Sequence, residues 1–341
     1  MTVNSAINGQ LIEVLRVAAG RPDLEYERPP EPLRGGFWAE LLTFSLARPP
    51  DGWPAELVAR LMPETRSAGK EMIVHRAVAA AGYPTPRVRA SGGPDDGLGR
   101  AFIVMDRAAG RSALSGLDSG LTLAGVRRVL QVPGLLATVM AQLHALDPEL
   151  VRGELETVRE APVTVPGLLA AVARLAGEYG RPDLAAAAGW LADHPPRTAP
   201  DVICHGDLHP FNLLDDGGQV TVLDWSTALL APRGYDAGFT ALLLSEPPVR
   251  VPAWQRPLLR WFGRALARRF LRGYQRRAGT TVKPGELSWY QGLVCLRSLV
   301  EVAGWVHDGM ADTHAGHPWL ALGPALARRL TALTGIAVRS R

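Results

Sequence analysis

The stretch that most constrains the fold of this chain lies at residues 204–225. It reads CHGDLHPFNLL, then DDGGQ, then VTVLDW. Two short apolar runs therefore flank an Asp-Asp-Gly-Gly segment, whose composition is typical of a tight turn. We expect a β-hairpin with strands at 212–214 and 220–224, which returns Asp224 beside Asn212.

Three side chains of this stretch suit one kind of chemistry. Asp207 can accept the proton of an attacking hydroxyl group, whereas Asn212 and Asp224 offer the oxygen ligands that a hard cation such as Mg²⁺ prefers. Asp207 precedes Asn212 by five residues, which is the Asp-to-Asn spacing of the HRDxxxxN loop of protein kinases. A polar loop between buried strands would explain Asp207 and Asn212 as turn residues. It would not predict an Asp-Trp pair at this distance, so we favour phosphoryl transfer.

The phrase His-Gly-Asp-Leu-His-Pro-x-Asn, followed by Asp-Trp, resembles the aminoglycoside phosphotransferase and choline kinase superfamily. The resemblance implies an α+β, bilobal, protein-kinase-like fold. Its N-terminal lobe, residues 1–107, would bind the nucleotide on a small antiparallel sheet with one main helix. Its C-terminal lobe, residues 108–341, would be larger and mostly helical, and would carry the catalytic and substrate-binding residues. The similar region spans most of residues 30–310 and is strongest at 204–236.

Composition limits the alternatives. With 341 residues, of which 47% are apolar, the chain can bury a large core in two lobes. No apolar run is long enough to predict a membrane-spanning helix, and residues 1–10 lack a secretory signal pattern. Two cysteines indicate neither a disulfide framework nor a metal cluster, so we expect a cytoplasmic protein. The net charge of +4 is spread along the chain, which argues against a nucleic-acid partner.

The first third of the chain predicts the small lobe. Apolar residues recur at helical spacing at 4–19, and the charged, Pro-rich segment 22–32 is expected to be a connector. The segments expected to form the sheet and its main helix are 41–47, 56–61, 88–91 and 101–105 for the strands, and 67–81 for the helix.

The resemblance assigns nucleotide-binding roles in this lobe. Arg60 stands at the strand position where kinases present a Lys to the α/β-phosphates, and Arg can still bind phosphate in a bidentate manner. Glu71, in the first turn of the main helix, is expected to pair with Arg60. Ordinary roles stay open, because Arg60 could be an exposed residue at a strand end and Glu71 could stabilise a helix start.

Two further segments are assigned to the nucleotide by their order in the chain. Gly35 and Gly36 could form a loop that covers the phosphates with backbone N–H groups, although two glycines before a strand also form ordinary turns. The segment from Met105 to Arg107 would be the hinge, whose backbone hydrogen-bonds the adenine edge. The cofactors implied are ATP or GTP and Mg²⁺.

The rest of the chain reads mainly as helices, expected at 135–147, 166–180, 183–192, 239–244, 254–277, 286–310 and 320–336. His144 ends the first of them and is expected to be a core or capping residue rather than a catalytic one. The resemblance implies that Asp236 anchors the catalytic loop through hydrogen bonds. Arginines recur every four residues from Arg256 to Arg276. This spacing winds around a helix, so it indicates a solvated face rather than a membrane contact.

The acceptor groove is expected between the catalytic loop and the C-terminal helices. The side chains that could line it are Glu246, Glu301, Trp305, His307, Asp308 and Asp312. Because the chain is net basic, we favour a neutral or partly apolar hydroxyl acceptor, such as a macrolide or another natural product, over a polycationic aminoglycoside. Choline would need an aromatic cage, for which Trp289, Tyr290 and Trp305 are available.

These residues together predict a Mg²⁺-dependent O-phosphotransferase that uses ATP or GTP and a small-molecule hydroxyl acceptor. A non-catalytic, kinase-like nucleotide-binding module stays open, because Arg60 replaces Lys and the glycine loop is sparse. A choline or amino-alcohol kinase is also open. The intact Asp207, Asn212 and Asp224 argue against a binding module. A protein kinase is disfavoured, since no Asp-Phe-Gly or Ala-Pro-Glu phrase follows Asp224.

Overall fold

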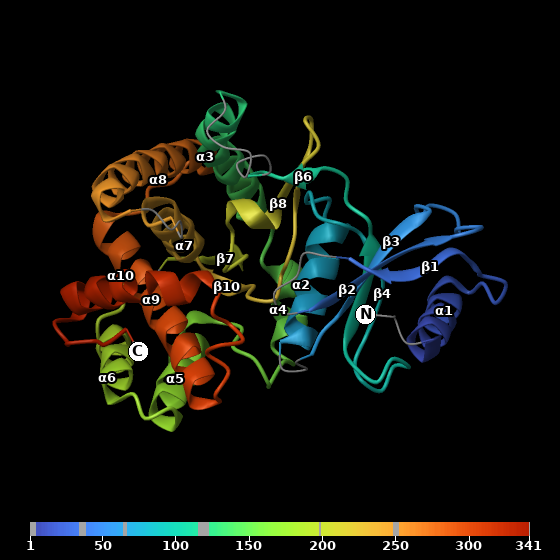
Figure 1. Ribbon diagram of the computed structural model, residues 1–341, viewed down its shortest axis with the longest axis horizontal. Coiled ribbons are helices and arrows are strands. Elements are labelled where there is room, and N and C mark those ends of the chain that lie inside the picture. Colours follow the sequence, from blue (N-terminus) through green and yellow to red (C-terminus); the bar gives the residue numbers. More distant parts are fainter. Residues whose placement is uncertain are drawn as a thin grey trace. The chain divides into compact units, whose positions relative to one another are not determined.

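The computed structural model describes residues 5–33, 39–63, 67–114, 123–197, 199–247 and 252–340. The chain folds into two compact units, whose elements are labelled in Figure 1. The first comprises Met1–Ala113, Glu149–Ala161 and Phe211–Ala228, and the second comprises Leu114–Pro148, Pro162–Pro210 and Leu229–Arg341. The first unit thus combines the N-terminal third with two later segments. The lobe boundary at residue 107 stays a prediction.

The first unit is built on a five-stranded antiparallel sheet in the order β1-β2-β3-β5-β4. Its strands are β1 (Tyr26–Pro32), β2 (Glu40–Leu46), β3 (Glu56–Leu61), β4 (Val88–Gly92) and β5 (Phe102–Asp106), and its helices are α1 (Ser5–Ala19), α2 (Ala68–Ala80) and α4 (Glu149–Leu155). The sheet and the main helix α2 follow the expected segments. The short helix α4 was not among the predicted elements, because its two turns are too short for a clear helical period.

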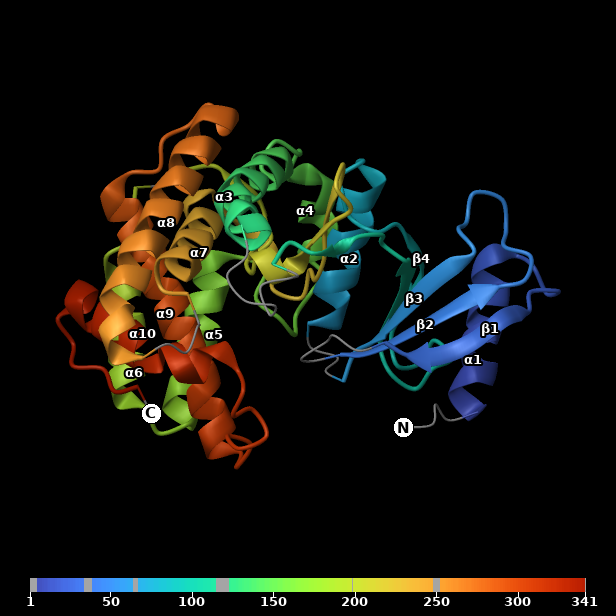
Figure 2. The same cartoon turned by 45° about the horizontal axis from the view of Figure 1, so that its top comes forward.

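Alternation along β3 decides which side chains face each helix. Leu57 and Ala59 belong to the buried cluster that contains Leu11 and Leu15 of α1. Side chains of a strand point alternately to its two faces, so Arg60 points away from this cluster. Residues of the opposite face form a second cluster with Ala68 of α2, and α1 and α2 lie against opposite faces of the sheet (Figure 2). The strand period therefore directs Arg60 toward α2.

The segment predicted as a connector is a strand over most of its length, so that prediction is wrong. Among the described strands, β1 pairs with β2 alone, from Tyr26 opposite Leu46 to Pro32 opposite Leu42, with register shifts between them. Its sequence, YERPPEP, contains three prolines. Proline has no backbone N–H to donate, so such a strand is compatible with a sheet only at its edge.

The predicted β-hairpin is present in the first unit. Strands β8 (Leu213–Asp215) and β9 (Val220–Val222) pair antiparallel, and β6 (Arg111–Ser112) completes a three-stranded sheet. The carboxylate of Asp216 accepts hydrogen bonds from the N–H groups of Gly218 and Gln219 at 2.9 and 2.7 Å. These bonds close the turn that the Asp-Asp-Gly-Gly composition predicted.

The second unit is mostly helical. Its helices are α3 (Leu123–Leu143), α5 (Val165–Glu178), α6 (Pro182–Asp193), α7 (Gly234–Ser245), α8 (Arg256–Ala278), α9 (Pro284–His307) and α10 (Pro318–Thr334), and strands β7 (Asp201–Cys204) and β10 (Leu229–Pro232) form a small sheet. Helices α5, α6, α7 and α10 pack around α9, which carries much of the core (Figures 1 and 2). Among the described residues, none of the helices combines the length and apolarity that a membrane crossing requires.

Candidate active site

The predicted ion pair between Arg60 and Glu71 is present in the first unit. Nε of Arg60, near the end of β3, lies 3.0 Å from Oε1 of Glu71 in the first turn of α2. The Glu71 side chain is 2% exposed and that of Arg60 is 12% exposed. The guanidinium is therefore held from inside the protein, while part of it still reaches the surface.

Arg60 also contacts a third charged residue of the same unit. Its Nη2 donates a hydrogen bond to Oδ1 of Asp224 at 3.2 Å, and the Asp224 side chain is 27% exposed. This contact was not predicted. It joins residues 164 positions apart in the sequence, and no local period links them. In the first unit, Arg60 thus lies between two carboxylates, those of Glu71 and Asp224.

The charges of Arg60, Glu71 and Asp224 control each other's ionisation. Burial raises the pKa of Glu71 to about 7, and Asp224 acts in the same direction, whereas Arg60 opposes the shift. Burial alone would disfavour the charge of Arg60, but the two carboxylates raise the pKa of Arg60 above its ordinary value. Arg60 therefore stays cationic, and Glu71 can change its protonation near neutral pH.

Asn212 and Asp224 are brought together as the hairpin predicted. The N–H of Leu223 donates to the backbone carbonyl of Asn212 at 2.9 Å. Asp224 has a φ of 66°, the only positive value for a non-glycine residue among the described residues, in a region that Asp tolerates better than most residues. Ser226 donates its hydroxyl to Oδ1 of Asp224 at 2.7 Å. A carboxylate and an amide oxygen on adjoining chain segments form a donor set that suits Mg²⁺.

The other nucleotide residues predicted for this unit are only partly described. Met105 is half-buried in β5, opposite Val58 of β3. The N–H of Arg107 donates to the carbonyl of Glu56 at 3.2 Å, and the Arg107 guanidinium pairs with the Glu56 carboxylate at 3.3 Å. The segment thus leaves the sheet at the expected position. Gly35 and Gly36 lie outside the described residues.

In the second unit, Asp236 holds the loop that follows β7. Its two carboxylate oxygens accept hydrogen bonds from the N–H groups of His205 and Gly206 at 2.8 and 2.7 Å. Asp236 is 0% exposed and lies in the first turn of α7. Burial alone would raise the pKa of Asp236, but hydrogen bonds from His144 and from the loop keep it below its ordinary value. The loop is therefore tied to a buried anion.

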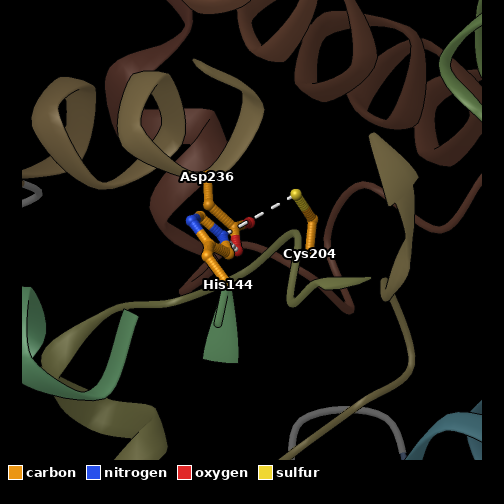
Figure 3. A group of neighbouring side chains, drawn as sticks. All are labelled: His144, Cys204 and Asp236. Atoms are coloured by element: carbon orange, nitrogen blue, oxygen red, sulfur yellow. Dashed lines mark hydrogen bonds and ion pairs between the residues drawn. The ribbon is translucent and has the colours of Figure 1, made fainter. Parts of the chain in front are cut away.

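His144, in the turn directly after α3, supports this anchor, as shown in Figure 3. Nε2 of His144 lies 3.1 Å from Oδ2 of Asp236, and Nδ1 lies 2.7 Å from the hydroxyl of Tyr274 on α8. Cys204 lies nearby, with Sγ 3.8 Å from Nε2. Burial raises the pKa of Cys204 well above its ordinary value, and its thiol donates to the carbonyl of Ala231 at 3.5 Å. We therefore interpret His144, Cys204 and Asp236 as a hydrogen-bonded support, in keeping with the core role expected for His144.

Asp207 lies next to these anchored positions, and its own side chain remains accessible. The N–H of Asp207 donates to Nδ1 of His205 at 3.3 Å, and Thr240 donates its hydroxyl to the carbonyl of Leu208 at 2.7 Å. The Asp207 side chain is 26% exposed, and its Oδ2 lies 3.4 Å from Nε2 of His209. The structure thus combines a restrained backbone with a carboxylate that solvent can reach.

The residues proposed for the acceptor groove have different environments. Trp289 and Tyr290 are buried in the core around α9, and the Trp289 Nε1 donates to the carbonyl of Leu191 at 3.2 Å. They form no accessible aromatic cage, so that expectation is wrong for these two residues. Trp305 is also largely buried and packs against His314. The remaining predicted groove residues are Glu246, which pairs with Arg260, the half-buried Glu301, and the exposed His307, Asp308 and Asp312.

Comparisons with known proteins agree with this architecture. The family model described as "Phosphotransferase enzyme family" matches residues 40–285, whereas no curated protein matches the chain. A candidate aminoglycoside phosphotransferase from Ralstonia eutropha JMP134 aligns with a TM-score of 0.64 at 18% identity, covering 98% of this chain and 96% of that one. The GDP and kanamycin complex of APH(2")-IIIa aligns with a TM-score of 0.57 at 17% identity, over 91% and 97%. The macrolide 2'-phosphotransferase MphH from Brachybacterium faecium aligns at 0.52 and 20% identity, over 92% and 98%.

The structural likeness confirms the predicted α+β, protein-kinase-like fold. The family match covers well over half of the 341 residues and includes Arg60, Glu71, Asp207, Asn212 and Asp224. The chain therefore belongs to the phosphotransferase enzyme family, and it is a small-molecule kinase.

Proposed function

We propose that this kinase transfers the γ-phosphoryl group of ATP or GTP to a hydroxyl group of an antibiotic or another natural product, with Asp207 as the base. The observation that carries the proposal is the environment of Asp207. Backbone groups on both sides of it are hydrogen-bonded to Asp236 and Thr240, while its carboxylate is 26% exposed. A general base needs a fixed position and access to substrate, and this arrangement provides both.

In the proposed reaction, the Asp207 carboxylate orients the acceptor hydroxyl and takes its proton as the oxygen attacks the γ-phosphorus. The bond from this phosphorus to the bridging oxygen breaks, and the nucleoside diphosphate leaves. His209, 3.4 Å from the Asp207 carboxylate, restricts where that carboxylate can lie. Catalysis of this kind depends mainly on positioning and charge neutralisation.

The first unit would hold the nucleotide. Arg60, fixed by Glu71 at 3.0 Å, would bind the α/β-phosphates. The backbone from Met105 to Arg107 would bind the adenine edge, and Gly35 and Gly36 would cover the γ-phosphate. A solved structure that this chain resembles contains GDP, which supports a nucleotide site without deciding between ATP and GTP.

Asn212 and Asp224 would hold Mg²⁺, and Ser226 would orient the Asp224 carboxylate through its 2.7 Å hydrogen bond. The bound ion would neutralise charge on the phosphate oxygens. Such an enzyme would act in the cytoplasm, where these nucleotides are available.

For the acceptor, we favour a neutral or partly apolar hydroxylated compound. The net charge of +4 opposes a polycation, and the buried Trp289 and Tyr290 leave choline without the aromatic cage considered above. Among the similar solved structures are a macrolide phosphotransferase and an aminoglycoside phosphotransferase crystallised with kanamycin. Both classes of antibiotic therefore belong in the acceptor panel.

The test is a steady-state assay of nucleoside diphosphate release with ATP or GTP, Mg²⁺, and a panel of macrolides, aminoglycosides and choline. We expect turnover with at least one antibiotic class and a loss of about 10³-fold or more in Asp207→Asn, because the base is removed. Asp216→Asn in the exposed hairpin turn is the matched control and should retain the wild-type rate. Wild-type turnover in Asp207→Asn would remove the mechanism. Mg²⁺-independent nucleotide binding without turnover would favour the binding module.

A further inference from the structure

A second cation stands beside the loop that carries Asp207, and it comes from α9. Arg297 is half-buried in this otherwise largely buried helix. Its Nη2 donates to the backbone carbonyl of Gly206 at 3.1 Å, and its Nη1 donates to the hydroxyl of Tyr235 at 2.9 Å. The guanidinium carbon lies 5.5 Å from the centre of the Phe239 ring, within the range of a cation–π contact.

These contacts complete the restraint of one peptide segment. The N–H of Gly206 donates to Asp236 at 2.7 Å, and the carbonyl of the same residue accepts from Arg297 at 3.1 Å. Gly206 has a φ of 77°, a left-handed conformation that glycine adopts without steric cost. Because Gly206 directly precedes Asp207, a rotation of its peptide would move the Asp207 carboxylate.

The residue directly before Asp207 is a glycine in this chain, in the phrase His-Gly-Asp, whereas protein kinases have an arginine there, in His-Arg-Asp. An arginine beside the loop therefore comes from another element, which here is α9. Burial disfavours the charge of Arg297, yet Tyr235, Asp207 and Glu301 together raise the pKa of Arg297 above its ordinary value. Arg297 thus stays cationic, and its field acts on Asp207.

We infer that Arg297 is a positioning residue for phosphoryl transfer, which holds the Gly206 carbonyl and thereby fixes the Asp207 carboxylate at the acceptor hydroxyl. This inference rests on the proposed role of Asp207. A planar guanidinium can bind the Gly206 carbonyl and the Tyr235 hydroxyl at once, whereas a lysine ammonium lacks this fork. Arg297 belongs to the second unit and Arg60 to the first. The loss of Arg297 should therefore lower kcat and leave the nucleotide KM nearly unchanged.

The experiment compares kcat and nucleotide KM in Arg297→Met, Arg297→Lys and Tyr235→Phe, with the acceptor that turns over fastest. We expect Arg297→Met to lower kcat about 10²-fold, since a small misplacement of a reacting group costs about that much, with nucleotide KM within about twofold. Arg297→Lys should recover about tenfold of this loss, because it restores the charge without the fork. Tyr235→Phe leaves the Gly206 contact intact and should stay within about threefold of the wild type.

Wild-type kcat in Arg297→Met would overturn the inference, and so would a loss confined to nucleotide KM. If Arg297→Met does not fold, Arg297→Lys decides: a kcat about tenfold low at unchanged nucleotide KM supports the role, and wild-type kcat overturns it. Asp207→Asn is measured beside these variants. If Asp207→Asn keeps turnover, the proposed function fails. If Asp207→Asn is inactive and Arg297→Met is fully active, only the role of Arg297 fails.

Discussion

Asp224 in the first unit and Asp236 in the second stand twelve residues apart in the sequence, and their surroundings differ. Asp224 is 27% exposed and accepts hydrogen bonds from the side chains of Arg60 and Ser226. Asp236 is 0% exposed and accepts hydrogen bonds from the backbone of His205 and Gly206. The Asp224 carboxylate is thus held mainly by side chains at a partly exposed site, whereas the Asp236 carboxylate is held in the interior by two backbone N–H groups and by His144.

This difference suggests separate roles for the two carboxylates, with Asp224 serving ligand binding and Asp236 serving the stability of the fold. Side-chain partners such as Arg60 can exchange one anion for another, so Asp224 can release them when a cation or a phosphate arrives. The N–H groups that donate to Asp236 are buried, so water cannot take the place of its carboxylate. Removing the carboxylate therefore leaves these donors unsatisfied. The comparison predicts that substitutions at Asp236 cost stability, whereas those at Asp224 cost activity.

The largest expected effect is on the stability of Asp236→Ala. Removing a buried anion from two backbone donors and His144 should lower the free energy of unfolding by about 3–5 kcal/mol. Chemical denaturation followed by circular dichroism measures this change. Asp224→Ala is the matched control and should lose about 1 kcal/mol or less. Equal losses in the two variants would abolish the contrast.

The second effect concerns turnover in Asp224→Ala. We expect kcat to fall by about 10²–10³-fold while Tm stays close to the wild-type value, because the proposed cation ligand is lost from a partly exposed site. Ser226→Ala only frees the carboxylate to rotate, so it should lose less than tenfold. Assays across a Mg²⁺ titration, with Tm measured on the same samples, would test this. A folded Asp224→Ala enzyme with normal kcat would assign the cation elsewhere.

The third effect is a pH dependence of stability that belongs to Glu71. Its pKa is about 7 in the folded protein against an ordinary 4.5, so the folded state binds the extra proton between these values. The contribution of Glu71 to stability is therefore complete below about pH 4.5 and is lost as the pH rises through about 7. In Glu71→Gln this loss, up to about 3 kcal/mol, should disappear. Denaturation at several pH values measures it, and an unchanged slope in Glu71→Gln would assign the pH dependence to other groups.

The smallest effect is expected for Arg60. Arg60→Ala should raise the nucleotide KM about tenfold, the cost of a charge-assisted hydrogen bond to phosphate, with kcat less affected. Arg60→Lys should stay closer to the wild type, since it keeps the charge. Initial rates at saturating acceptor decide this. Arg100→Ala, which removes an exposed pair with Glu40, is the control. Unchanged KM in Arg60→Ala would show that another residue binds the phosphates.

The parts of the molecule that the sequence predicted are those set by a local pattern or by a family motif. The turn composition at 215–218 predicted the hairpin, whereas the pair between Arg60 and Glu71 was expected from the family resemblance. The edge strand β1 was missed because proline-rich composition suits both a connector and a sheet edge. The buried Trp289 and Tyr290 were weighed as a cage, since aromatic residues on a helix do not reveal from sequence which of them face the core.

Apart from the Asp236 anchor, which the resemblance implied, the long-range polar contacts of the second unit carried no signal in the sequence. His144 contacts Asp236, which is 92 residues away in the sequence, and Tyr274, which is 130 residues away. Arg297 hydrogen-bonds to Gly206, which is 91 residues away. Each pair joins elements whose separate patterns are those of ordinary helices and loops. Such contacts depend on how α3, α7, α8 and α9 pack, which apolar periodicity does not specify at the level of individual polar atoms.

The location of the two cysteines has a practical consequence. Cys204 and Cys295 are 0% exposed, and burial raises the pKa of both thiols. Neither thiol can therefore react with a thiol reagent while the second unit is folded. Both belong to the second unit, and the sequence has no others. The rate at which a thiol reagent labels the native chain therefore reports the opening of the second unit alone. A nucleotide that slows this labelling would reveal that occupation of the first unit stabilises the second.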